Sequence, residues 1–244
     1  MIALSRHELL WVLEQCGAAE WPYPLAPVVW PADTADETVL ARARTEDALR
    51  GRGLLAAEPA AALLAVGTAV REAVRQVDVV RRSAADPAAA VALDGPGGAA
   101  LLRSSDHVGA PVQVRILGSS ETATAALAVL PRLPPAPGPT LEVPPEAAAV
   151  ETRRRERDRL AVEAVLRSAS AWTRLGVVVA PDGVGSGGAR AHARVEWLDS
   201  PRGRYRVRHD PGPGRPHLVP DDAASPGTRA EVEGLLAEPG RRTG

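Results

Sequence analysis

Lysine and phenylalanine are absent from this chain of 244 residues, and cysteine occurs once. Without lysine there is no Walker-type phosphate loop, no Schiff-base enzyme and no protein-kinase strand lysine. With Cys16 alone, a disulfide framework and a thiolate metal cluster are excluded. An excess of one charge is missing too, because 29 basic and 30 acidic residues give a net charge of −1. This balance argues against a dedicated nucleic-acid-binding protein.

Long apolar runs are also missing. The longest, residues 59–70, is far shorter than the ~20 residues that cross a bilayer. The first residues lack the basic segment and apolar segment of a signal peptide. We therefore expect a cytoplasmic protein without membrane insertion.

Helix starts are marked by the S/T-x-x-E capping box, which occurs at Ser5, Thr34 and Thr228. In this motif a hydroxyl and a carboxylate satisfy the free amides of the first helical turn. The first two boxes predict two amino-terminal helices, and the third belongs to a predicted last helix over residues 226–238. An Ala/Leu-rich helix is predicted over residues 59–71.

From about residue 76 the spacing of apolar residues changes from the helical period to a period of two. Over residues 112–117, apolar side chains alternate with Gln113 and Arg115, which is typical of a strand with one solvent-exposed face. The elements predicted in this region are strands over residues 77–82, 89–93, 99–103 and 112–117, and then a helix over 120–130.

A segment with seven prolines, residues 131–145, predicts an extended connector. The elements predicted after it are a helix over 146–172, strands over 175–180, 190–199, 204–209 and 215–219, and the last helix. On the helix over 146–172, the predicted buried stripe consists of Val162, Val165, Leu166, Ala169 and Trp172.

Helix, strand meander and helix thus occur twice, in residues 1–130 and 146–238. We expect two related halves that share one central, mostly antiparallel twisted sheet within a single domain of residues 1–240. The predicted fold class is α/β, of the α+β type, and residues 241–244 are expected to form a frayed tail.

The turn at residues 200–203, Ser-Pro-Arg-Gly, fits a type I turn followed by a left-handed glycine. A three-residue loop of this kind pairs residues whose numbers add to 404, so Trp197 is predicted to lie opposite Val207. Two opposite-charge pairs are then predicted on the other face: Glu196 with Arg208, and Arg194 with Asp210.

A glycine-rich loop over residues 183–188 matches G-x-G-x-x-G. A dinucleotide site needs a helix directly after this motif, whose amino end holds the pyrophosphate. The strict alternation over residues 190–197 indicates a strand instead, so a loop between strands is the favoured interpretation. A nucleotide- or small-molecule-binding enzyme that uses the Gly183–Gly188 loop remains the alternative function.

Side chains for catalysis or metal binding do not form a recognisable pattern. His192 and His209 fall on neighbouring predicted strands but not opposite each other, and no HExxH or cysteine pair accompanies them. No G-x-S-x-G elbow is present. We expect no catalytic residues, no cofactor and no metal.

Arginines are concentrated in residues 153–159, Arg-Arg-Arg-Glu-Arg-Asp-Arg. The run is typical of a solvated helix face with internal ion pairs, and it also fits a surface for an acidic partner. A generic adaptor for such partners is therefore a third functional hypothesis. The five tryptophans are expected in the core, and an exposed one would be a candidate binding anchor.

Several ordered segments carry a family resemblance: residues 8–13 (ELLWVL), 22–25 (PYPL), 52–54 (RGL) and 195–205 (VEWLDSPRGRY). Together they resemble the EspG family, the cytosolic chaperones of type VII (ESX) secretion in actinobacteria. The hairpin sequence is similar to the family's W-x-D-x-x-x-G-R-Y pattern and carries most of the specificity. The Gly-rich loop lacks the glutamine of the family's G-x-G-Q-x entry.

The resemblance implies a central sheet flanked by amino- and carboxy-terminal helical bundles, and a binding function without catalysis. It implies that the chain covers the apolar tip of a PPE-type subunit in a PE–PPE heterodimer, which would otherwise aggregate. The regions implied as partner-binding are the loop at residues 83–87 and the helix through Trp172. The candidate partner-binding residues are Ser83, Asp86, Pro87, Arg157, Arg167 and Trp172. No nucleic acid is expected as a partner, and homodimer formation by the free chain is left open.

Overall fold

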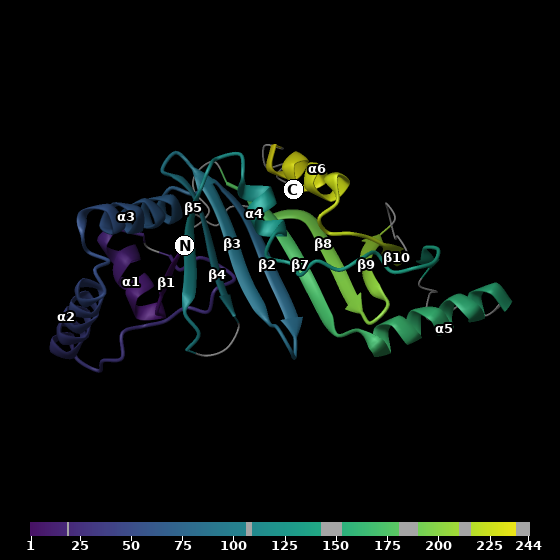
Figure 1. The fold of residues 1–244 in the computed structure, drawn as a ribbon, viewed down its shortest axis with the longest axis horizontal. Helices are drawn as coiled ribbons and strands as arrows, with labels where there is room; N and C mark the ends of the chain where they lie inside the picture. Colours follow the sequence, from purple (N-terminus) through teal and green to yellow (C-terminus); the bar gives the residue numbers. More distant parts are fainter. Residues whose placement is uncertain (19, 106–108, 143–152, 181–189, 210–215, 238–244) are drawn as a thin grey trace.

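Ten strands form a single sheet in the computed structural model of the chain (Figure 1). The structure describes residues 1–18, 20–105, 109–142, 153–180, 190–209 and 216–237. Every pair of neighbouring strands in the sheet is antiparallel. The predicted α+β fold around an antiparallel sheet is therefore confirmed.

The elements fall into two sets along the chain. The strands of the first set are β1 (Ile2–Leu4), β2 (Arg75–Ser83), β3 (Ala88–Gly95), β4 (Gly98–Ser105) and β5 (Val112–Leu117). Those of the second set are β6 (Leu141–Glu142), β7 (Ala171–Val179), β8 (Arg190–Ser200), β9 (Gly203–His209) and β10 (Pro216–Pro220). The helices of the described residues are α1 (Arg6–Gln15), α2 (Ala35–Gly51), α3 (Ala57–Arg71), α4 (Thr122–Leu127), α5 (Arg153–Ser168) and α6 (Pro226–Ala237).

The strand order has an internal symmetry. From edge to edge it runs β1-β5-β4-β3-β2-β7-β8-β9-β10-β6. Each half thus supplies a short edge strand, one or more helices, a four-stranded meander and a closing helix, and the two meanders meet at β2 and β7. The sequence predicted the helix, meander and helix of each half, and it missed both edge strands, which have three residues and two residues.

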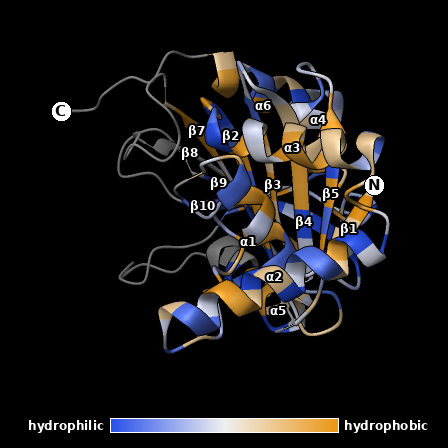
Figure 2. Ribbon diagram, turned by 90° about the vertical axis from the view of Figure 1, so that its left-hand side faces the viewer, coloured by the Kyte–Doolittle hydropathy of each residue, from blue (hydrophilic) through white to orange (hydrophobic). Residues whose placement is uncertain are grey.

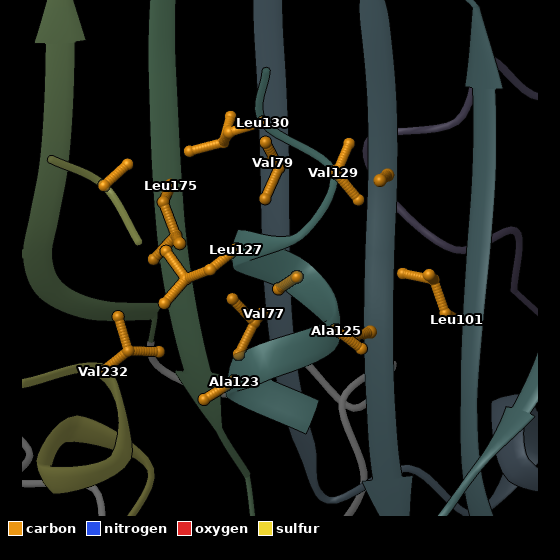
Figure 3. Close-up of a cluster of buried hydrophobic side chains, with 14 of the residues drawn as sticks. Val77, Val79, Leu101, Ala123, Ala125, Leu127, Val129, Leu130, Leu175 and Val232 are labelled. Carbon is orange, nitrogen blue, oxygen red and sulfur yellow. The ribbon is translucent and has the colours of Figure 1, made fainter. Parts of the chain in front are cut away.

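Helices cover both faces of the sheet. On one face, α3 packs on β3, β4 and β5, α1 packs on α3 and β1, and α2 packs on α1. On the same face, α5 packs on β8 through Val162, Val165 and Leu198. On the opposite face, α4 and α6 lie over the middle of the sheet. Figure 3 shows Leu127 of α4 close to Leu175 of β7, with Val232 of α6 beside them. The two carboxy-terminal helices are therefore divided between the faces.

The capping boxes at Ser5 and Thr34 form as predicted. The Ser5 hydroxyl accepts from the Glu8 N–H at 3.1 Å, and the Glu8 carboxylate accepts from the Ser5 N–H at 2.6 Å. The prediction that Thr228 caps the last helix is wrong. Ser225 takes that place, because its hydroxyl accepts from the Thr228 N–H and Pro226 occupies the first helical position, where proline needs no hydrogen-bond acceptor.

The prediction of one helix over residues 146–172 is also wrong at its end. Helix α5 stops at Ser168, and Trp172 lies in β7. The cause is the pattern after Ser168: Ala171, Thr173 and Leu175 are buried at a spacing of two, which is the spacing of a strand. Leu166 was placed on the buried stripe, but its side chain is 53% exposed.

The predicted register of the 200–203 hairpin is wrong by one residue. Ser200 pairs with Gly203 and Trp197 with Arg206, so the loop has two residues and Trp197 and Val207 lie on opposite faces. Glu196 consequently pairs with Val207 instead of Arg208. The other predicted charge pair, Arg194 with Asp210, involves a residue outside the described ones.

A tertiary contact explains this register. The proline-rich segment docks on the start of β9: the Arg204 N–H donates to the Pro134 carbonyl at 2.9 Å, and the Ala136 N–H donates to the Arg204 carbonyl at 3.0 Å. Gly203 lies beneath it with φ of +123°, and a Cβ there would be 2.7 Å from the Pro134 oxygen. The glycine is thus required both by its positive φ and by the docked segment.

A charged cluster is buried on the α4 and α6 face. The Asp199 carboxylate, 1% exposed, accepts hydrogen bonds from Arg204 Nε at 2.6 Å and from Arg81 Nη1 at 2.5 Å. Arg204 Nη2 adds a second bond at 3.0 Å, which makes that pair bidentate. One carboxylate thus joins β2, β8 and β9, since each strand supplies one of the three side chains.

We expect Asp199→Ala to lower the free energy of unfolding by about 3–5 kcal/mol, because it leaves buried guanidinium groups without their counter-charge. Urea denaturation of both proteins measures the difference. Asp47→Ala is the control, since the Asp47 side chain is 74% exposed and should change stability by less than about 0.5 kcal/mol. A loss for Asp199→Ala no larger than that of the control would contradict the structural role of the cluster.

Gly203→Ala should cost about 1–3 kcal/mol, because alanine strains the backbone at this φ and its Cβ collides with the Pro134 carbonyl. Gly227→Ala is the matched control: it has open space for a Cβ in the first turn of α6, where alanine is preferred over glycine. The two midpoints of thermal unfolding should move in opposite directions. Equal midpoints would show that the 134–136 segment moves aside at no cost in stability, which would contradict the prediction.

Candidate partner-binding surface

Trp172 is the only exposed tryptophan of the five, all of which lie in described residues. Its side chain is 52% exposed, whereas Trp197 is fully buried and the other three are half-buried. In the sheet Trp172 lies between Arg82 of β2 and Leu198 of β8. A large aromatic side chain left in solvent on a regular strand has the features of a binding anchor.

The β2–β3 loop, residues 83–87, adjoins Trp172. Ser83 pairs with Ala171, the residue before Trp172. The Ser83 hydroxyl accepts from the N–H groups of Ala85 and Asp86 at 3.2 and 3.3 Å, which folds the loop into a tight turn. Both oxygens of Asp86 accept from Arg81, each at 3.2 Å. The loop is therefore held by its own side chains.

The Asp86 carboxyl has a lowered pKa. Partial burial opposes its charged form, but the hydrogen bonds from Arg81 and Ser83 and the positive charges of Arg81 and Arg103 outweigh that effect and lower the pKa. Asp86 is thus an anion at neutral pH and is held in one orientation by a guanidinium.

The last turn of α5 completes the surface. Leu166 is 53% exposed, the Arg167 side chain is 74% exposed, and two residues connect this helix to β7. In Figure 1 the end of α5, the start of β7 and the β2–β3 loop lie along the lower edge of the sheet. We call the set formed by Arg82, the loop 83–87, Leu166, Arg167 and Trp172 the Trp172 surface.

Five of the six partner-binding residues expected from the sequence lie on the Trp172 surface: Ser83, Asp86, Pro87, Arg167 and Trp172. Arg157 does not, since it lies on the same helix as Arg167 but about 15 Å away at 1.5 Å per residue. A partner-binding role for Arg157 stays a prediction. Leu166 and Arg82 are additions. Arg82 lies beside Trp172 through the pairing of β2 with β7, and Leu166 is exposed near the end of α5.

The arginine-rich run forms the start of α5, and part of it is paired internally. Arg159 donates to Glu156 at 2.7 Å and to Glu163 at 2.5 Å, and these two carboxylates raise the pKa of the Arg159 guanidinium. This agrees with a solvated helix face laced with ion pairs. The run therefore has fewer free cations than the sequence suggests.

The chemistry of the Trp172 surface is that of a docking site. It combines two exposed apolar side chains, Trp172 and Leu166, with two exposed arginines, Arg82 and Arg167. Aromatic residues and arginine are the types enriched where proteins bind each other. Such a surface favours a partner with an apolar tip and acidic or carbonyl groups around it.

Ligand chemistry has little support elsewhere in the described part of the chain. No group of three or more His, Cys, Asp or Glu residues with metal-binding geometry occurs there. The Gly183–Gly188 loop lies outside the described residues, and the element after it is β8, a strand paired with β7. The helix that a dinucleotide fingerprint requires is therefore not the next element, which contradicts the nucleotide interpretation.

A hollow of about 420 Å³ is lined by His7 of α1, by Trp30 and Pro31 of the connection that follows, and by residues of α2. Trp30 in its wall stacks on His7 with ring centres 5.7 Å apart and donates to Glu14 at 2.8 Å. The polar and aromatic groups of Trp30, His7 and Glu14 are thus bound to one another. In Figure 1, α2 lies at one end of the long axis, whereas the end of α5, the start of β7 and the β2–β3 loop lie at the lower edge of the sheet, so the hollow is separate from the Trp172 surface.

None of the described helices is long and apolar enough to cross a membrane. Figure 2 shows hydrophobic colouring along β3, inside the sheet, whereas α2 is mixed in colour. The apolar residues of this chain thus serve chiefly its core.

Comparison with known proteins places these features in a family. No curated protein sequence matches the chain. Among solved structures, the chain is similar to the type VII secretion system chaperone EspG5 of Mycobacterium tuberculosis, solved in complex with a PE25–PPE41 dimer. The TM-score is 0.58 at 12% identity, over 96% of this chain and 95% of the other, which shows a shared fold. The model of the EspG family matches residues 5–241, and the chain therefore belongs to the EspG family.

Proposed function

We propose that this chain is a cytoplasmic chaperone that binds the apolar tip of a PPE-type subunit in a PE–PPE heterodimer. In binding it keeps the heterodimer soluble and competent for type VII secretion. Membership of the EspG family supports this function, as does the solved relative bound to a PE25–PPE41 dimer. The observation that carries the proposal for this chain is the exposed Trp172 beside the β2–β3 loop.

The Trp172 surface has the physical properties that such a role requires. Covering an apolar tip needs apolar groups that are exposed before binding and rigid enough to lose little entropy. Trp172 stands on a central strand hydrogen-bonded on both sides, and Leu166 lies on a helix anchored by Val162 and Val165. The exposed Arg82 and Arg167 add charged hydrogen-bond donors, which orient the partner.

The role is one of binding, with no bond-making step by the chain itself. Shielding an apolar tip prevents its self-association, and the stabilisation depends on affinity and partner concentration. The alternative of a nucleotide-binding enzyme has no structural feature in its favour, because β8 follows the Gly183–Gly188 loop.

Co-expression of the chain with PE and PPE proteins encoded beside it should give a stable 1:1:1 complex. Size-exclusion chromatography with light scattering measures its mass and also shows whether the free chain is a dimer. The PE–PPE pair alone should aggregate, since its tip is uncovered. Failure to form a complex with every such pair would count against the chaperone function.

Trp172→Ala should weaken binding of the PE–PPE pair by roughly 30-fold or more, as expected for a buried aromatic anchor of about 2 kcal/mol or more. Leu166→Ala should also weaken it. Leu40→Ala on α2 is the matched control, because Leu40 and Leu166 are similarly exposed, at 55% and 53%, and α2 lies away from the sheet edge that carries the Trp172 surface. Calorimetry gives the three affinities, and equal losses for Leu166→Ala and Leu40→Ala would place the partner elsewhere.

A further inference from the structure

We propose that Arg81 is a positioning residue for partner binding: it holds the β2–β3 loop in its binding conformation by linking Asp86 to the buried Asp199. This role rests on the proposed chaperone function. Arg81 itself is buried on the α4 and α6 face, whereas Trp172 lies on the opposite face. It therefore touches the loop from behind and leaves the front of the loop free for a partner.

The hydrogen bonds of Arg81 point in two directions. Nε and Nη2 donate to the two oxygens of Asp86, which is a bidentate contact. Nη1 points the other way and donates to Asp199 at 2.5 Å and to the hydroxyl of Thr173 at 3.3 Å. One planar guanidinium thus spans from a loop side chain to the core, and its own side chain is only 6% exposed.

The charges of the cluster balance only when the loop is in place. Arg81 and Arg204 are two buried cations, and Asp199 is the one buried anion between them. Asp86, whose side chain is 55% exposed, supplies the second negative charge. If the loop moved away, one guanidinium would be left buried without a full counter-charge, which is unfavourable. The buried charges therefore stabilise the loop conformation in which Asp86 contacts Arg81.

Asp199 keeps a hydrogen-bonded counter-charge without Arg81, so a change at Arg81 breaks the link to the loop and leaves the rest of the cluster paired. Arg204 alone provides Asp199 with a bidentate partner at 2.6 and 3.0 Å. Replacing Arg81 by glutamine leaves a neutral Asp199–Arg204 pair in the core and keeps a donor for Thr173. The loop is released and the fold is retained, which makes the role testable in a folded protein.

A loop that is held before binding raises affinity, since the apparent dissociation constant increases as the fraction in the competent conformation falls. Arg81→Gln and Asp86→Asn should each weaken binding of the PE–PPE pair by about tenfold if the free loop is competent about a tenth of the time. The double variant should be no weaker than either single one, since both remove the same link.

The test combines two measurements on the full chain. Hydrogen exchange on the free protein reports the loop amides of Ala85 and Asp86, which now donate to Ser83. Calorimetry with the PE–PPE pair reports affinity. Exchange in the loop should be faster in Arg81→Gln and Asp86→Asn and unchanged in Asp47→Asn, a control at an exposed site on α2.

The outcomes separate the two proposals. Binding by the wild-type protein with no change in Arg81→Gln overturns the positioning role alone. Weaker binding in Asp86→Asn but not in Arg81→Gln also overturns it, since Asp86 then contacts the partner directly. If the wild-type protein binds no PE–PPE pair, the chaperone function fails and the partner role of Arg81 fails with it. Should Arg81→Gln not fold, Asp86→Asn with its exchange data decides, because Asp86 is at the surface.

Discussion

The pairing of β2 with β7 is the interaction on which the rest of this structure depends. Nine residue pairs, from Arg75–Val179 to Ser83–Ala171, join two halves that lie on either side of a proline-rich segment. Without this seam each half would be a five-stranded sheet with β2 or β7 as an open edge, prone to pair with other chains. The seam also creates the candidate site, because it sets the β2–β3 loop beside Trp172 and the buried Arg81 beside Thr173.

Small side chains characterise the core on the α4 face. Phenylalanine is absent, and β3 presents Ala88, Ala90 and Ala92 to a helix that carries Ala123, Ala125 and Ala126. Small residues on both sides allow the helix to lie close to the sheet, and Figure 3 shows α4 over the strands. Alanine side chains are small and similar in shape, so they do not restrict how the helix and the sheet pack together. The hydrogen bonds of Asp199 form only when β2, β8 and β9 are in one arrangement. We infer that the charged cluster adds the specificity that a core of small side chains lacks.

Local patterns in the sequence predicted most elements and missed contacts made across the chain. The capping boxes at Ser5 and Thr34 predicted helix starts correctly, because their hydrogen bonds are complete within four residues. The hairpin register was wrong because Gly203 serves a contact with Pro134, about 70 residues away. The resemblance indicated the region of the candidate surface. The Arg81–Asp86–Asp199 link depends on how β2, β7 and β8 assemble in the sheet, and no local pattern reports that.

Hydrogen–deuterium exchange on the complex with a PE–PPE pair, compared with the free chain, tests the central claim most directly. The account predicts new protection at the β2–β3 loop, at the end of α5 and at the start of β7, with α1 and α2 unchanged. Protection confined to α1 and α2, which lie away from the Trp172 surface, would contradict it.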